Sequence, residues 1–135
     1  MSREKIIIDA GESPLGRVAS YAAKQSLLGK EIIIINCNNS VVSGRKKMVF
    51  GEYLIARVRG GSSLKGPHFP KSPERIMKRT VRGMLSYKQG RGREALKRVM
   101  CYNDVPSEFE KSNKISLKKE LKTSYLSLGE LSKIL

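Results

Sequence analysis

The chain has 135 residues, about the length of one domain with its own hydrophobic core. Its 27 Lys and Arg against 12 Asp and Glu give a formal charge of +15, an excess typical of proteins that bind a polyanion such as nucleic acid. No run of about 18 apolar residues is available to span a bilayer, and residues 1–9 lack the layout of a signal peptide, so we expect a soluble intracellular protein.

The first 35 residues predict a strand, a helix and a second strand. Residues 6–8 and 32–35 are continuous apolar runs, which are typical of strands covered on both faces. Between them, residues 11–14 form a turn, apolar positions recur at helical spacing from Leu15 to Ser26, and Gly29 is a stop signal. A unit of this length predicts parallel strand pairing and an α/β core.

The turn invites an enzyme hypothesis, because "GESPLGRV" has two glycines separated by four residues where a phosphate-binding loop would begin a helix. Such a loop needs Lys and then Ser or Thr after the second glycine, but Arg17 and Val18 stand there. The one histidine, His68, has no nucleophile signature beside it, and Asp9 and Glu12 show no sign of sharing a pocket. Enzymatic activity is therefore the second hypothesis, with no cofactor or metal predicted.

Positive charge is concentrated in the middle of the chain. Residues 45–98 carry sixteen cations and three acids, and so hold +13 of the +15. A block of one sign between nearly neutral ends is the pattern expected of phosphate contacts. At its start, Arg45, Lys46 and Lys47 precede a further expected helix, whose first backbone N–H groups would add to an anion site.

Residues 72–85 predict a basic amphipathic helix. Ser72, Pro73 and Glu74 are an N-cap, a first-turn proline and an acid near the positive helix end. Four cations occupy an arc of roughly 100° opposite apolar residues; they are Arg75, Lys78, Arg79 and Arg82. A solvated helix face is the alternative, but like charges at this spacing repel one another without a partner, so we expect anion binding.

Loops rich in glycine and proline are predicted on both sides of this helix. Arg91 and Arg93 alternate with glycines in "GRGR", which we expect to be a Gly-Arg loop close to a phosphate backbone. Phe69 and Tyr87 are candidates either for stacking on a base or for burial.

The composition changes near residue 105, so we expect residues 1–105 to fold as a domain and residues 106–135 to form a helical extension. Helices are expected around residues 117–122 and 128–134. Their leucines require a partner, either this domain or a neighbouring protein. Cys37 and Cys101 are far apart and lack metal-ligand spacing, so we expect reduced structural thiols.

Three segments resemble the family of large ribosomal subunit protein thirteen, in its archaeal and eukaryotic branch. They read "IIIDAGESPLGRVAS", "IIIINCNNSVVSGRKKM" and "KSPERIMKRTVRGMLSYKQGRGREALKRVMCYNDVPSEF". The most specific motif is "SPERIMKRTVRGML", followed by "GR", a short helix and "RVMCY". Two positions depart from the family pattern: Ser86 replaces a usual proline, and Cys101 a small aliphatic residue.

The resemblance implies a three-layer α/β/α domain with a small, largely parallel sheet of about four strands. It implies a structural constituent of the large ribosomal subunit in the cytoplasm, without catalysis or cofactor. The implied partners are large-subunit ribosomal RNA and neighbouring large-subunit proteins, with no membrane and no independent homo-oligomer. The RNA-binding residues implied by the motif are Arg75, Lys78, Arg79, Arg82, Lys88, Arg91 and Arg93, with Lys65, Lys71, Arg45, Lys46 and Lys47 as neighbours.

Overall fold

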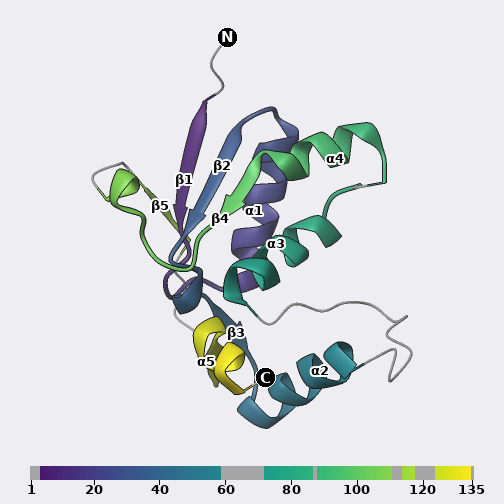
Figure 1. Cartoon of the computed structure of the whole chain (residues 1–135), viewed down its shortest axis with the longest axis vertical. Coiled ribbons are helices and arrows are strands. Elements are labelled where there is room, and N and C mark those ends of the chain that lie inside the picture. The colour runs from purple at the N-terminus through teal and green to yellow at the C-terminus, as the bar shows by residue number, and fades with distance from the viewer. Residues whose placement is uncertain (1–3, 59–71, 87, 111–113, 118–123, 135) are drawn as a thin grey trace.

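A four-stranded parallel sheet forms the centre of the computed structural model (Figure 1). The structure describes residues 4–58, 72–86, 88–110, 114–117 and 124–134. The strands are β1 (Lys5–Asp9), β2 (Glu31–Ile35), β4 (Val99–Cys101) and β5 (Ile115–Ser116), in the order β4-β2-β1-β5. The predicted α/β class and four-stranded, largely parallel sheet are therefore confirmed.

Helix α1 (Leu15–Leu27) connects β1 to β2, as the sequence predicts. The residues of its apolar stripe are buried. Gly29 follows in a left-handed conformation with φ of 94°, which a residue with a Cβ rarely adopts. β2 is buried from Ile32 to Ile35, whereas β1 alternates between buried and partly exposed positions. The expectation of cover on both faces is therefore confirmed for β2 alone.

Helices α3 (Pro73–Gly83) and α4 (Gly90–Lys97) both contact α1, so the three helices form one layer on the same face of the sheet (Figure 1). The opposite face of the sheet is covered by side chains of the segment after β4. There, Tyr102 and Phe109, the latter in the 3-10 turn η3 (Ser107–Phe109), have ring centroids 6.1 Å apart. Within the described residues, the sheet thus has one helical layer, and side chains of the segment after β4 lie on its other face.

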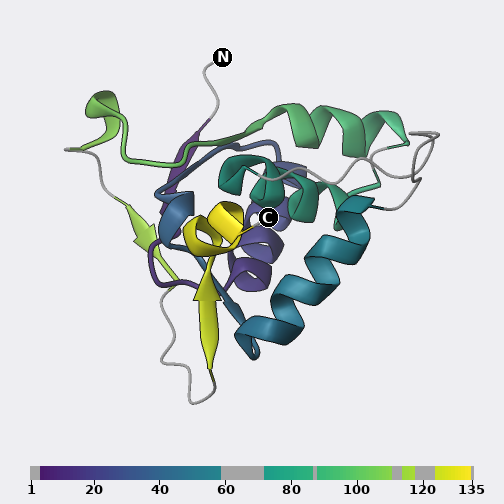
Figure 2. The same ribbon diagram turned by 60° about the horizontal axis from the view of Figure 1, so that its bottom comes forward.

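The C-terminal segment packs on the same chain. β6 (Tyr125–Ser127) pairs antiparallel with β3 (Val41–Ser43), and then leads into α5 (Leu128–Ile134), which lies against α3 and the 3-10 turn η1 (Cys37–Asn39), as Figure 2 shows. Three tail leucines belong to the central core with 2% exposure or less; they are Leu126, Leu128 and Leu131. The predicted helix at 128–134 is confirmed, whereas most of the one at 117–122 lies outside the described residues.

Candidate nucleic-acid interface

Helix α3 separates an apolar inner face from a basic outer face. Ile76, Met77 and Val81 are fully buried and fix that side of the helix against α1 and β4. On the other side Arg75 is exposed, and Arg79 and Arg82 are partly exposed. We call these three residues the α3 arginine face. Met84, whose spacing favours the apolar side, is instead 45% exposed.

Lys78 lies on the same helix, but its ammonium group is used within the fold. Its Nζ donates hydrogen bonds to the carbonyl oxygens of Leu96, at 2.8 Å, and of Val99. Partial burial removes water from the ammonium group and lowers the pKa of Lys78. The side chain therefore ties α3 to the junction between α4 and β4.

The N-terminus of α3 is capped by a residue from a distant segment. Ser72 occupies the N-cap position, as predicted, but makes no side-chain capping bond, and its Oγ donates to Glu74 Oε1 at 3.3 Å. Asn103 Oδ1 instead accepts the backbone N–H of Glu74 at 2.9 Å. The predicted N-cap position of Ser72 is therefore confirmed, while the capping hydrogen bond comes from Asn103.

The predicted Gly-Arg loop is wrong, because Gly90–Lys97 forms helix α4. A Cβ on Gly92 would overlap the carbonyl group of Ser86, whereas one on Gly90 would meet open space. Gly92 thus lets the first turn of α4 approach the backbone that precedes it. Three exposed cations lie at this turn, which we call the α4 basic turn: Lys88, Arg91 and Arg93.

A third group of cations lies at the start of α2 (Lys46–Val58), where the sequence predicts a helix N-terminus. Arg45, Lys46 and Lys47 are exposed and form what we call the α2 basic end. The first turn of α2 contains no acidic residue, so its backbone N–H groups and these side chains all favour an anion. Lys65 and Lys71, and also His68, Phe69 and Tyr87, lie outside the described residues.

The α2 basic end and the α4 basic turn have no acidic partner among the described residues. An ion pair is formed elsewhere, between Lys30 Nζ and Glu4 Oε2 at 3.8 Å. Within each cluster, the three exposed like charges without such compensation repel one another, and a polyanion would relieve this repulsion.

The turn at residues 11–14 has a structural role. Asp9 Oδ1 accepts the Gly11 N–H at 2.9 Å and lies 3.4 Å from Asn36 Nδ2. A Cβ on Gly11 would lie 2.6 Å from that amide nitrogen. The Asp9 carboxylate already accepts the Gly11 N–H, so this donor of the turn is not available to a phosphate. In the described residues, no three acidic, His or Cys side chains group to hold a metal, and no helix is long and apolar enough to cross a membrane.

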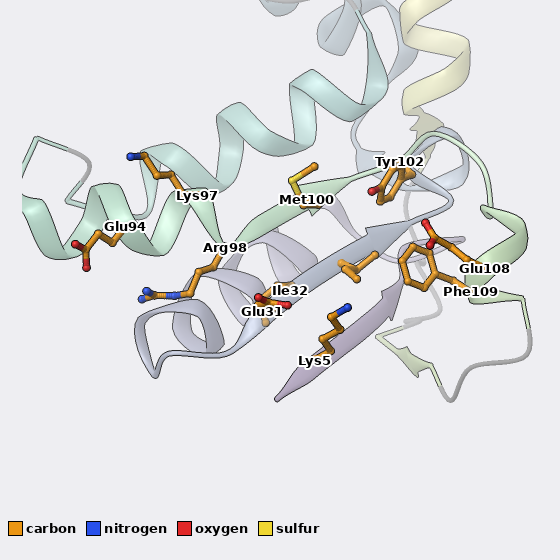
Figure 3. A pocket seen from close by; sticks show the side chains of 11 residues that line it. Lys5, Glu31, Ile32, Glu94, Lys97, Arg98, Met100, Tyr102, Glu108 and Phe109 are labelled. Carbon is orange, nitrogen blue, oxygen red and sulfur yellow. The ribbon is translucent and has the colours of Figure 1, made fainter. Parts of the chain in front are cut away.

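A groove of about 670 Å³ lies along the open face of the sheet (Figure 3). Tyr102 and Phe109 line one end, and Glu94 and Lys97 of α4 lie at the other. Its charged lining is balanced, with Lys5, Lys97 and Arg98 against Glu31, Glu94 and Glu108. Such a lining lacks the one-sign character of a phosphate-binding surface, so the groove does not extend the basic clusters.

Comparison with known proteins gives one consistent family. The model of the family described as ribosomal protein L13 matches residues 3–108. Among the relatives, the large ribosomal subunit protein uL13 of Archaeoglobus fulgidus is 45% identical, covering 96% of this chain and 86% of that protein. The uL13 proteins of Methanosarcina barkeri and Methanocaldococcus jannaschii are 45% and 42% identical, covering 93% and 94% of this chain and 94% of each relative.

These relatives carry the names of ribosomal proteins and not of enzymes, which agrees with the non-enzymatic prediction. The matched region contains every element from β1 to β4, including α3 with its arginine face and α4 with its basic turn. On these grounds, the chain belongs to the ribosomal protein L13 family.

Proposed function

We propose that the protein is a structural component of the large ribosomal subunit that binds large-subunit ribosomal RNA through the α3 arginine face, the α4 basic turn and the α2 basic end. The observation that supports this most is α3 itself. Ile76, Met77 and Val81 on its apolar side are fully buried, while its arginines lie on the outer side, within a stretch from Arg75 to Arg93 that contains no acid. The names of the uL13 relatives identify the ribosomal subunit to test.

The proposed mechanism is neutralisation of phosphates by cations held on rigid helices. Arginine presents a planar fork of N–H donors that matches phosphate oxygens, and a helix fixes where each fork begins. Contacts to phosphate and 2′-hydroxyl groups position a protein on folded RNA without reading its sequence. We therefore expect few base-specific contacts and a main effect of holding RNA helices that would otherwise repel each other.

Lys78 is set apart from the proposed RNA contacts. Its ammonium group already donates to two backbone carbonyls, so its charge supports the fold and contributes to the surrounding potential. Lys65 and Lys71 stay candidate contacts on sequence grounds alone.

Photocrosslinking in assembled subunits would test this proposal. A photoreactive residue placed at Arg91, in the α4 basic turn, should crosslink to large-subunit RNA. The same residue placed at Met100, which is 50% exposed in the balanced groove, is the matched control and should give far less RNA crosslinking. Equal RNA crosslinking at both positions, or none at Arg91, would contradict the assignment of the interface.

Cofractionation separates the ribosomal role from a free regulator of DNA or messenger RNA. The native protein should sediment with large subunits and stay there at moderate salt. A predominantly free pool would favour the regulator.

A further inference from the structure

Cys37 and Cys101 are far apart in the sequence but adjacent in the fold. Cys101 pairs with Ile34 in the register of β2 and β4. The backbone N–H of Cys37 donates to the carbonyl oxygen of Tyr102, the residue after Cys101, at 3.1 Å. The two cysteines thus lie on chain segments that are directly hydrogen bonded to each other.

Both cysteines also belong to the packing of the central core. The carbonyl oxygen of Ile34 accepts the N–H of Tyr102 at 2.8 Å and lies 4.0 Å from Cys37 Sγ. Cys37 is fully buried in the central core, and the partly exposed Cys101 packs against that core. Both cysteines are free thiols.

The ionisation of Cys37 reflects this contact. A hydrogen bond with the Cys101 thiol raises the pKa of Cys37, and burial raises it further. Cys37 is therefore a protonated thiol held against its neighbour, while Cys101 has the access to solvent that reaction with a small oxidant requires.

We propose that Cys37 and Cys101 form a reversible intramolecular disulfide when the protein meets a peroxide. The Cys101 thiolate attacks one peroxide oxygen, the O–O bond breaks, and a sulfenic acid and hydroxide form. The Cys37 sulfur then attacks the sulfenic sulfur, the S–O bond breaks, and the departing hydroxide takes up the Cys37 proton as water. The hydroxide of the first step takes up the proton that Cys101 released when it ionised. In total, hydrogen peroxide oxidises two thiols to one disulfide and is reduced to two waters.

The bond would fix the segment that supports α3. Residues 36–38 already donate backbone hydrogen bonds to residues 102–104, at 3.3, 3.1 and 3.2 Å. Asn103, within that segment, caps the N-terminus of α3. A disulfide at this point closes a loop of more than sixty residues, so we expect the oxidised protein to melt about 10 °C higher than the reduced protein.

Mass spectrometry of the wild-type chain provides the main test and requires no variant. Dilute protein is treated with hydrogen peroxide, alkylated under denaturing conditions and digested. The expected product has lost two hydrogens and yields one peptide pair joined through Cys37 and Cys101, which dithiothreitol separates.

Two variants test the order of reaction. In Cys37→Ser, the sulfenic acid on Cys101 has no resolving thiol, so dimedone should label Cys101 strongly, whereas wild type should be labelled weakly. In Cys101→Ser, the buried Cys37 should stay unmodified and peroxide should leave the melting temperature unchanged.

The proposal is overturned if oxidised wild-type protein keeps both thiols, or if it forms only disulfides between molecules. It is also overturned if dimedone labels Cys101 equally in wild type and in Cys37→Ser, because Cys37 would then take no part in the reaction.

Discussion

Replacement of the three arginines of the α3 arginine face by glutamine would test the proposed interface most directly. In Arg75→Gln, Arg79→Gln and Arg82→Gln combined, glutamine keeps helix propensity and hydrogen-bonding capacity while it removes three charges. The residues that fix the inner side of α3 are unchanged and fully buried. We therefore expect the variant to fold and to bind a large-subunit RNA fragment more weakly.

The size of the effect follows from counterion release. Each phosphate contact contributes about 0.9 to the slope of log K against log salt on a duplex, so three lost contacts flatten the slope by about 2.7. Between 50 and 200 mM salt, a fourfold change, the loss of affinity caused by salt should then be about 40-fold smaller for the variant than for wild type. The RNA affinities of the wild type and the variant should differ most at low salt.

Fluorescence anisotropy across a salt series measures both the affinity and the slope. The charge-matched control replaces Lys5, Lys24 and Lys133 by glutamine; all three are exposed and lie outside the basic block. Circular dichroism melting of each protein checks that the folded state is compared in every case.

Two results would refute the argument. If both triple variants lose the same affinity and slope, net charge alone explains binding and the arginine face has no special role. If the arginine variant binds like wild type at every salt concentration, α3 presents a solvated surface.

Four further predictions concern stability, measured by urea denaturation. Lys78→Met should lower the free energy of unfolding by about 1–3 kcal/mol, since two carbonyl groups lose a charged donor. Because burial lowers the pKa of Lys78, the folded state binds fewer protons than the unfolded state between that pKa and 10.5. The wild type should therefore gain stability relative to the variant as pH rises through this window. Asn103→Ala should lower the free energy of unfolding by about 1 kcal/mol by removing the α3 cap, whereas Asn103→Asp should keep the cap and the stability. An equal loss of stability in both variants would contradict the capping role. Gly92→Ala should cost more than about 2 kcal/mol because its Cβ meets backbone, whereas Gly90→Ala, in open space, should be neutral or stabilising. Truncation after Val105 removes three buried leucines, and the loss of about 2–5 kcal/mol for each is together comparable to the whole stability of a domain. Composition suggests that residues 1–105 fold independently, but on this ground we expect the truncated chain to show no cooperative transition. A cooperative urea transition of the truncated chain would contradict this expectation.

Local sequence patterns predicted the elements whose structure depends on local hydrophobicity. The isoleucine runs identified β1 and β2, and helical spacing between them identified α1 and its buried stripe. The same reasoning located α3 from its first-turn proline and its separate apolar and basic sides. In each case the residues that decide the structure lie within one or two turns of each other.

Features that depend on distant contacts were not accessible in this way. Two glycines in four residues oppose helix formation by propensity alone, but the fit of Gly92 against Ser86 makes the same glycine suitable for the first turn of α4. The polar composition after residue 105 suggested an extension, yet β6 pairs with β3 and its leucine enters the core. The contact between Cys37 and Cys101 has no local signal at all.

The orientation of α3 shows why a basic helix face cannot be divided into RNA contacts and structural residues from spacing alone. Lys78 lies beside Arg82 on the helical arc and at the opposite edge from Arg79, where carbonyl groups of the α4–β4 junction are within reach. Asn103 fixes the end of the helix and Lys78 fixes its middle, so together they determine where the three arginines point. Loss of Asn103 should therefore weaken RNA binding only as far as it unfolds or rotates α3, and loss of Lys78 should add to this the removal of one positive charge from the surrounding potential. Loss of the arginines should change the salt dependence of binding while the fold persists, and this difference distinguishes the residues that position the surface from those that form it.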